Sequence, residues 1–449
     1  AADGASHDER VPGISRKAWD RWAAVDYAAA LREPLHATLT MKEPPRWFRG
    51  SLVRAYGVAL DEWMRSKSTA SWALLLFTPR LLLAPTSNKG EEGKAELTKR
   101  MERFLRGEWP ELLEETALAS APRKPRRHAE DEDQAQAEER KLETACQKVR
   151  QGEVSRAREH LTTSGLAPGK ADTLAELTDP ARRPRVLSQA IPEHVLNHAP
   201  AAAFALNRDQ LFSCLSTARK GRAADLFGTR LEHLRVLLDS GTNWEHFVRM
   251  AEAFSKGETP QEVVELMKLG RMTALKKRDG RARGIVIGCA FRRLVGKTMA
   301  RQCAGLFQRA TAPYQFALQT RAGMDACSLA PWALTDADPD LVVMSLDGVG
   351  AYDHVRRAAF LQALQEDPEL ACLLPLIRQF YTTPSTYLWV DDQGMIHEIY
   401  QGEGGEQGDP LMPALYSLGQ HGALRHAASQ LLSGEYVFAY LDDLYIACS

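Results

Sequence analysis

The sequence lacks paired cysteine motifs and lacks an apolar run long enough to cross a membrane. Its seven cysteines are irregularly spaced, without a Cys-x-x-Cys pair, which argues against a zinc site or a disulfide framework. The longest apolar run, Trp72 to Pro85, is interrupted by Pro79 and Arg80 and is shorter than the about 20 residues of a spanning helix. With no signal peptide at the start, we expect a nuclear or cytoplasmic protein with no membrane partner.

The chain also lacks an overall charge of one sign. It has 57 Lys and Arg against 58 Asp and Glu, a formal net charge of -1. This balance excludes a globally basic nucleic-acid binder, but it leaves room for local basic patches. A length of 449 residues with 44% hydrophobic content is enough to bury large cores, and it predicts two or three domains.

The first 204 residues carry no motif that indicates a function. We expect a helical region over residues 1–118, a charged linker over 119–140 and a helical connecting region over 141–204. The linker prediction rests on Ala121 to Arg140, where a basic cluster precedes an acidic one with too little apolar surface to drive folding. Four tryptophans precede residue 70, namely Trp19, Trp22, Trp47 and Trp63, and they are more typical of a core than of a binding platform.

A strong local basic bias lies between Lys268 and Arg301. The window holds eleven Lys and Arg residues and one acid, Asp279. Within it, "ALKKRDGRARGIVIG" predicts a hairpin with Asp279-Gly280 as its turn. Cations along two strand arms can bind phosphates. The alternative is a solvated charged face, which the one-signed bias disfavours.

Two adjacent acids interrupt an apolar stretch near the end of the sequence. In "VFAYLDDLYIACS", Tyr436 to Tyr440 and Leu444 to Ala447 predict a hairpin with a two-residue tip, Asp442-Asp443. Two neighbouring carboxylates repel each other, and a bound cation would neutralise them. An isolated Asp-Asp pair is more often a solvated turn, so a third acid is needed to favour a metal site.

The third acid follows a run of apolar residues. Leu341 to Leu346 predicts a strand covered on both faces, with Asp347 at its carboxyl end. From Asp353 onward the pattern is helical. Three carboxylates on adjacent strands can hold two Mg²⁺ ions about 3.5 to 4 Å apart, which stabilise the attacking and leaving oxygens of a phosphoryl transfer. This is the chemistry of polymerases and nucleases.

A glycine-rich loop separates the two acidic motifs. "QGEGGEQGDPLMPALY" has four glycines from Gly402 to Gly408, and a helix is predicted from Pro413 to about Ala428. Such loops let backbone approach a ligand, although glycine-rich loops alone are weak evidence. The order of acidic strand, Gly-Asp-Pro loop with helix, and acidic hairpin is the more specific signal.

These motifs resemble reverse transcriptases. "DGVGAYD", "EQGDPLMPALY" and "YLDD" resemble three central palm motifs, while "LKKRDGRARGIVIGCAFRRLVGK" and "APYQFALQTRAGMDA" resemble two fingers motifs. "KGRAADLFGTRLEHLRVLL" is similar to an amino-terminal motif of non-LTR (LINE-type) retrotransposon enzymes. The resemblance implies an α+β right-hand fold with fingers over residues 205–335 and a palm with an antiparallel sheet over residues 336–449. It also implies a fragment that ends just after the YxDD motif, with the thumb absent.

The resemblance assigns roles to individual residues. Asp347, Asp442 and Asp443 would be the catalytic acids and ligands of two Mg²⁺ ions, or of Mn²⁺, with Asp443 the weaker ligand. The other assigned residues would bind the substrates: Tyr352 as a gate against a ribose 2'-hydroxyl, Gln407 and Gly408 beside nucleotide and template, Lys277 and Arg283 at the triphosphate, and Tyr440 near the primer end. The implied partners are an RNA template, a DNA primer or target DNA, and dNTPs.

Two other functions stay open from the sequence. An RNA-directed RNA polymerase shares the acid geometry, but it would typically carry Gly-Asp-Asp at the hairpin and lack an aromatic gate. A catalytically incomplete remnant would bind nucleic acid through the basic window alone. The intact acids favour a nucleotidyltransferase that is an RNA-directed DNA polymerase.

Overall fold

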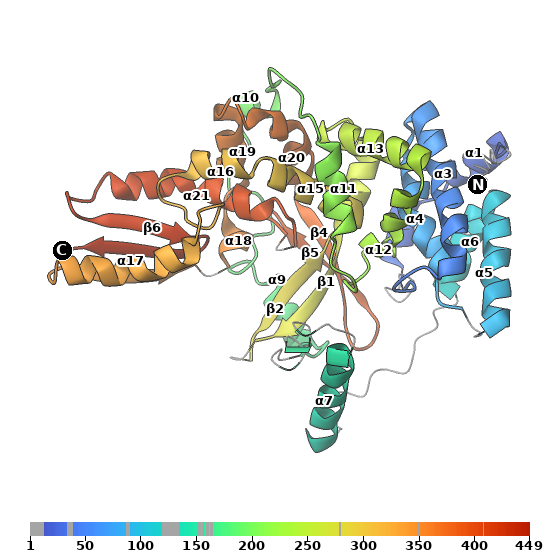
Figure 1. The fold of residues 1–449 in the computed structure, drawn as a ribbon, viewed down its shortest axis with the longest axis horizontal. Coiled ribbons are helices and arrows are strands. Elements are labelled where there is room, and N and C mark those ends of the chain that lie inside the picture. The colour runs from blue at the N-terminus through green and yellow to red at the C-terminus, as the bar shows by residue number, and fades with distance from the viewer. Residues whose placement is uncertain are drawn as a thin grey trace, which may run out of the picture.

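The computed structural model describes residues 13–33, 39–86, 90–118, 134–150, 154, 157–158, 161, 165–277, 280–348, 350–406 and 408–449. Figure 1 shows helices of the N-terminal region at one end of the molecule, a mixed sheet in the middle, and a second sheet with the C-terminus at the other end.

The N-terminal region is helical, as the sequence predicted. Its elements are α1 (Arg16–Ala23), α2 (Tyr27–Arg32), the 3-10 helix η2 (Arg46–Phe48), α3 (Arg49–Ser66), α4 (Thr69–Leu83), α5 (Gly90–Leu105) and α6 (Trp109–Leu118). The apolar run at Trp72 forms α4, which is buried all round and begins at Ser68, whose side chain accepts the Ser71 N–H. Three of the four early tryptophans are buried, whereas Trp47 is exposed.

The connecting region contains α7 (Gln134–Arg150), α9 (Ala171–Thr178), α10 (Glu193–Leu196) and α11 (Arg208–Ser216). The linker prediction was wrong for residues 134–140, which form the first two turns of α7. Their sequence, QAQAEER, consists of strong helix formers, and this preference prevails over the low apolar content. Residues 119–133 lie outside the described residues. The segment Asp179 to Arg185, with two prolines, follows the end of α9 at Thr178.

A four-stranded mixed sheet, in the order β2-β1-β4-β5, forms the middle of the molecule. Helical elements precede it: α12 (Leu231–Leu234), the 3-10 helix η3 (Arg235–Asp239), α13 (Gly241–Ser255) and α14 (Gln261–Lys268). Its antiparallel hairpin is β1 (Leu269–Lys276) and β2 (Ala282–Ile287). The predicted hairpin is confirmed, with the Lys277 N–H donating to the Arg281 carbonyl at 2.7 Å, although Asp279 lies outside the described residues.

The hairpin continues into α15 (Ala290–Gln302), α16 (Ala304–Thr311) and α17 (Gly323–Ala337). β1 also pairs in parallel with β4 (Ser385–Val390), which pairs with β5 (Ile396–Gln401). The mixed sheet therefore joins strands from both sides of the boundary that we predicted between fingers and palm.

The second sheet is antiparallel, in the order β3-β7-β6. It consists of β3 (Val342–Asp347), β6 (Tyr436–Tyr440) and β7 (Asp443–Cys448). Between β3 and β6 come α18 (Ala351–His354), α19 (Arg357–Glu366), η4 (Ala371–Leu373), α20 (Leu374–Tyr381) and α21 (Met412–Ala428). The helix predicted from Pro413 to about Ala428 is thus confirmed, and the whole chain is a mixture of helix and sheet, consistent with the α+β prediction.

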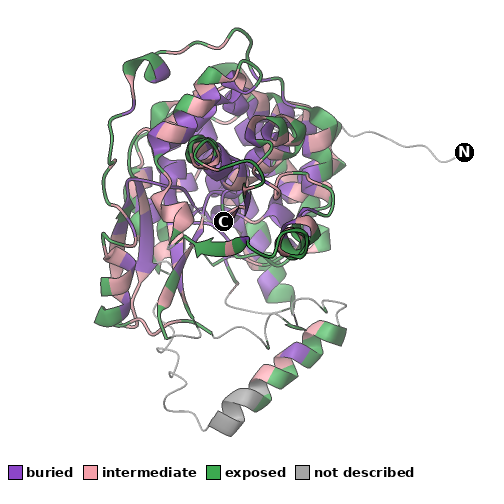
Figure 2. Cartoon of the chain, turned by 90° about the vertical axis from the view of Figure 1, so that its left-hand side faces the viewer, coloured by how far each residue is buried: buried purple, intermediate pink, exposed green. Residues whose placement is uncertain are grey.

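The prediction that β3 is covered on both faces was wrong. Val342, Met344 and Leu346 are 64%, 46% and 40% exposed, because β3 is an edge strand of the small sheet. The large core instead connects the N-terminal helices with α13, α15, α19, α20 and α21, and Figure 2 shows these buried residues gathered between the helices. The small sheet has a separate cluster, in which Val437 and Ala439 of β6 pack with Leu424 of α21.

Candidate active site

Strand pairing brings two of the three predicted acids together. Asp347, the last residue of β3, lies directly opposite Asp443, the first residue of β7. Residues opposite each other in an antiparallel pair point to the same face of the sheet. Asp442 precedes Asp443 in the turn from β6. The fold therefore closes the long sequence gap between Asp347 and the YLDD motif.

The turn itself lies one residue earlier than predicted. Tyr440 pairs with Asp443, so the two turn residues are Leu441 and Asp442, and Asp443 already belongs to β7. Leu441 has a left-handed φ of 55°, which is unfavourable for a leucine. Its N–H donates to Gln315 Oε1 at 2.8 Å. This contact from outside the hairpin helps to hold the turn, and the sequence pattern did not reveal it.

Asp442 and its neighbours form a cluster of negative charge. Partial burial raises the pKa of Asp443, and the charges of Asp442 and Asp347 raise it further. Burial followed by the charge of Asp442 also raises the pKa of Tyr352, and that of Tyr416 to about 12. Such a group of carboxylates favours hard cations with oxygen ligands. Within the described part of the chain, however, no three acidic, histidine or cysteine side chains are already arranged to hold a metal ion.

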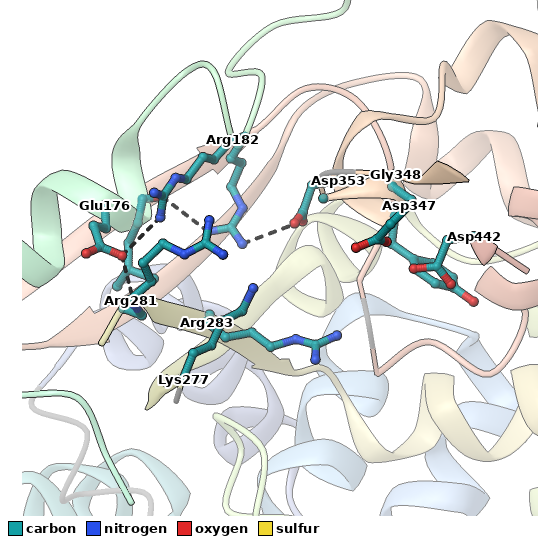
Figure 3. A pocket seen from close by; sticks show the side chains of 16 residues that line it. Glu176, Arg182, Lys277, Arg281, Arg283, Asp347, Gly348, Asp353 and Asp442 are labelled. Atoms are coloured by element: carbon teal, nitrogen blue, oxygen red, sulfur yellow. Dashed lines mark hydrogen bonds and ion pairs between the residues drawn. The ribbon is translucent and has the colours of Figure 1, made fainter. Parts of the chain in front are cut away.

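A cavity of about 320 Å³ separates the acids from the basic hairpin. Asp347 and Asp442 line one side, while Lys277 and Arg283 of the hairpin line the other. Figure 3 shows this division, with Asp347 and Asp442 facing the cationic side chains across the pocket. A magnesium-bound polyphosphate has the complementary arrangement, because the metal needs carboxylates and the phosphates need cations.

Tyr352 lines the same cavity and also packs against the core. It lies on α18, five residues after Asp347, and its ring stacks on Tyr416 of α21 with centroids 5.0 Å apart. The stacking fixes the plane of the ring at the edge of the pocket. The position of Tyr352 therefore allows it both to pack against the core and to act as a gate at the cavity.

The glycine-rich loop packs against α18 and the hairpin. The Gly404 N–H donates to the Val355 carbonyl at 2.8 Å, and the Gly405 N–H donates to the Tyr352 carbonyl at 2.9 Å. Gly404 has a φ of +62°, and a Cβ there would lie 2.1 Å from the Tyr352 carbonyl oxygen, so only glycine fits. Through these contacts the loop supports the position of Tyr352.

Two of the remaining predicted substrate residues, Gly408 and Tyr440, are not among the described residues that line the cavity. A Cβ on Gly408 would lie 2.8 Å from the Val286 carbonyl oxygen of β2, so this glycine allows the loop to approach the hairpin. Gln407 lies outside the described residues. Tyr440 pairs with Asp443 at the end of β6. Contacts of these three residues with nucleotide, template or primer stay predictions.

A buried ion network was missed by the sequence analysis. Arg292 of α15 donates to Glu406 Oε1 at 2.8 Å and to Asp409 Oδ2 at 2.7 Å. The Tyr381 hydroxyl donates to the same Asp409 oxygen at 2.7 Å. Burial raises the pKa of the Glu406 carboxyl, and the Arg292 guanidinium opposes that shift. The network fastens the glycine-rich loop to α15.

The network also corrects the interpretation of the basic window. Arg292 and Lys268 are buried and pair with acids of the chain itself, so they do not belong to an anion-binding surface. The exposed cations of the hairpin are Lys276, Lys277, Arg281 and Arg283. Glu406 and Asp409 were the sequence signal that could have indicated this network, because a buried arginine needs acidic partners.

Comparisons with known proteins agree with the arrangement of acids and cations. No curated protein matches the chain. Among the described residues, no helix combines the length and the apolar character that crossing a membrane requires. Residues 275–449, which carry the second strand of the hairpin, the three acids and the glycine-rich loop, match the family model of reverse transcriptase (RNA-dependent DNA polymerase), and this match supports RNA-directed DNA polymerase activity in general.

Proposed function

We propose that the chain is the polymerase of a retrotransposon, which adds dNTPs to a DNA primer on an RNA template. The observation that carries this proposal is the cavity in which Asp347 and Asp442 face Lys277 and Arg283. The family match over residues 275–449 supports the same reaction class. The amino-terminal motif "KGRAADLFGTRLEHLRVLL" favours the non-LTR branch.

Asp347 and Asp442 would hold two Mg²⁺ ions, or Mn²⁺, with Asp443 as the weaker third ligand. Burial first, and the charges of Asp442 and Asp347 second, raise the pKa of Asp443, and a bound cation would relieve the repulsion among these carboxylates. When bound, the ions supply Lewis acidity for the attacking 3'-hydroxyl and for the leaving pyrophosphate. The three carboxylates therefore fit the divalent metal ions that the proposed reaction needs.

The other residues of the cavity would bind and select the nucleotide. Lys277 and Arg283 neutralise the triphosphate, which aligns it for in-line attack. The ring of Tyr352, held by Tyr416, occupies the space that a ribose 2'-hydroxyl needs. Gln407, Gly408 and Tyr440 would contact the template and the primer end.

A primer-extension assay tests this function against its two alternatives. The chain is incubated with Mg²⁺ and a DNA primer annealed to RNA, with dNTPs or rNTPs in separate reactions. We expect extension with dNTPs and much less with rNTPs. Preferential use of rNTPs would indicate an RNA-directed RNA polymerase. Binding of the primed template without extension by either set would indicate a nucleic-acid-binding remnant.

A further inference from the structure

A segment upstream of the matched residues forms part of the cavity wall. We call residues 176–188 the upstream strap; it includes the last turn of α9 and the loop that follows. Glu176, Leu177, Arg182 and Arg183 of the strap line the cavity. Figure 3 shows Glu176 and Arg182 on the basic side, next to Arg281 of the hairpin. The strap lies outside residues 275–449 and outside the fingers and palm that the sequence predicted.

The strap holds the basic hairpin through its first residues. Glu176 Oε2 accepts the Ala282 N–H of β2 at 2.7 Å and the Arg182 guanidinium at 3.0 Å. A Cβ on Gly284 would lie 3.0 Å from Leu177 and 3.3 Å from Arg183 Nη2, so the strap packs closely against this strand. The hairpin arm that carries Arg283 is thereby attached to the strap.

The strap reaches the opposite wall through Arg183. This arginine is 6% exposed, and its Nη2 lies 3.5 Å from Asp353 Oδ1. Its Nη1 donates to the Leu177 carbonyl at 3.2 Å, whereas its buried Nε has no hydrogen-bond partner among the described residues. Asp353 directly follows Tyr352 on α18. The guanidinium thus connects the strap to the short helix that carries the tyrosine.

The strap also holds the glycine-rich loop. The Gly402 N–H donates to the Pro184 carbonyl at 2.7 Å. Ser188 donates its N–H and its hydroxyl to Glu403 Oε1, both at 2.6 Å, and the other Glu403 oxygen accepts the Arg357 N–H at 2.7 Å. One short segment therefore contacts the hairpin, α18 and the glycine-rich loop.

We propose that the upstream strap is a wall of the nucleotide pocket and that Arg183 is a positioning residue for Tyr352. The proposal rests on the proposed function. The Asp353 side chain is only 14% exposed, so its carboxylate is stabilised by a charged partner. Without Arg183 the carboxylate moves toward water, and α18, which has only four residues, moves with it. Tyr352 is then displaced from the sugar side of the pocket.

The test compares Arg183→Met and Arg183→Lys with wild type and with Arg309→Met as a matched control. Arg309 of α16 forms an exposed ion pair with Glu369, and neither residue lines the cavity. Single-nucleotide incorporation on an RNA template gives kcat and KM for a dNTP and for its rNTP. For Arg183→Met we expect the dNTP KM to rise about tenfold and the dNTP-to-rNTP selectivity to fall, since displaced binding groups cost affinity. Arg183→Lys should recover part of the selectivity, and Arg309→Met should match wild type.

Hydrogen exchange provides a second readout that needs no activity. In Arg183→Met we expect faster exchange of the amides at residues 350–354 and 402–405, with the β6–β7 amides unchanged. Unchanged selectivity, or unchanged exchange at residues 350–354, would overturn the role of Arg183. If wild type incorporates no nucleotide, the proposed polymerase function fails, while the exchange experiment still decides whether Arg183 positions α18.

Discussion

Carboxylates at three positions meet because a strand end and a turn lie side by side. Asp347 and Asp443 are opposite in the register, and Asp442 is the second residue of the turn. Each acid alone has an ordinary structural explanation as a turn or strand-end residue. Their shared location beside a cavity with cations on its far wall is what favours metal-dependent phosphoryl transfer.

Tyr352 gives the most direct prediction for a single side chain. Tyr352→Val removes the ring that stacks on Tyr416 and opens space beside Asp347. We expect the efficiency of rNTP incorporation relative to dNTP to rise by roughly 10-fold or more, because a steric clash with the 2'-hydroxyl is removed. Single-nucleotide kinetics on an RNA template measure the ratio. An unchanged ratio, with the protein still folded, would show that the ring serves only the core.

Sequence motifs predicted candidate site residues that stand in short local patterns. Asp347, Tyr352, Lys277 and Arg283 stand in short patterns of fixed spacing, and the structure places all four around one cavity. Arg183 could not be predicted in this way, because its partner Asp353 is far along the chain and a lone arginine in a polar loop gives no such signal. Buried pairs of this kind depend on the tertiary fold.

Among the secondary-structure elements, the β1–β2 hairpin shows how local and distant pairing differ in predictability. Its turn chemistry and alternating pattern predicted the antiparallel pair. The parallel pairing of β1 with β4 was not predicted, because it joins segments more than a hundred residues apart and leaves no short sequence signal. The exposed face of β3 was also mispredicted, since an apolar run does not reveal which strand is at a sheet edge.

The exposed arms of the hairpin give a prediction about RNA binding. In Lys276→Glu/Lys277→Glu we expect weaker RNA binding and a smaller salt dependence, with the slope of log K against log salt reduced by roughly 1.5 to 2 because two phosphate contacts are lost. Titrations of RNA at several salt concentrations measure the slope. Arg249→Glu/Arg309→Glu, with two exposed cations on α13 and α16 outside the basic window, is the control. An equal loss in both variants would mean that the hairpin has no special role.

At the scale of the whole molecule, the N-terminal helices and the matched region share one core. His233 of α12 connects the N-terminal region to the segment that precedes the mixed sheet. Its Nε2 lies 2.8 Å from the Met41 carbonyl oxygen, and its Nδ1 lies 3.2 Å from the Arg230 backbone nitrogen. Thr229 makes a second contact between the same two regions, because its hydroxyl donates to the Leu76 carbonyl at 2.9 Å. The Trp72 ring of α4 also packs against the Phe291 ring of α15 with centroids 5.4 Å apart, so the helical region contacts the matched region directly, and its own binding partners stay unassigned.

The burial of His233 predicts that the stability of the protein depends on pH. Burial lowers the pKa of His233 to about 4 from an ordinary value of 6.5. As the pH falls below 6.5, the unfolded chain takes up the proton first, so the free energy of unfolding decreases until about pH 4 and then levels off. Relative to His233→Gln, which keeps a donor and an acceptor, we expect wild type to lose about 3 kcal/mol across this range. Denaturant unfolding at pH 7, 5.5 and 4 measures the difference.

The comparison with His233→Gln removes effects that both proteins share. Burial raises the pKa of Asp225 to about 6 from an ordinary value of 3.8. Between these values the folded protein retains a proton that the unfolded chain has lost, so the contribution of Asp225 to the free energy of unfolding increases as the pH falls, opposite to that of His233. Its contribution is present in both proteins and cancels in the difference. Parallel stability curves for the two proteins would contradict the burial of a neutral His233.

The central claim is that Asp347 and Asp442 are the acids of a nucleotidyl transfer, and primer extension on an RNA template with Mg²⁺ and dNTPs tests it most directly. The proteins are wild type, Asp347→Asn, Asp442→Asn and Asp340→Asn, an exposed acid just before β3 that serves as the control. We predict a rate reduced roughly 10³-fold, or about 4 kcal/mol, in the first two variants, at a melting temperature no lower than that of wild type, because removing like charge relieves repulsion. The control should match wild type, whereas wild-type extension by Asp442→Asn would contradict the account.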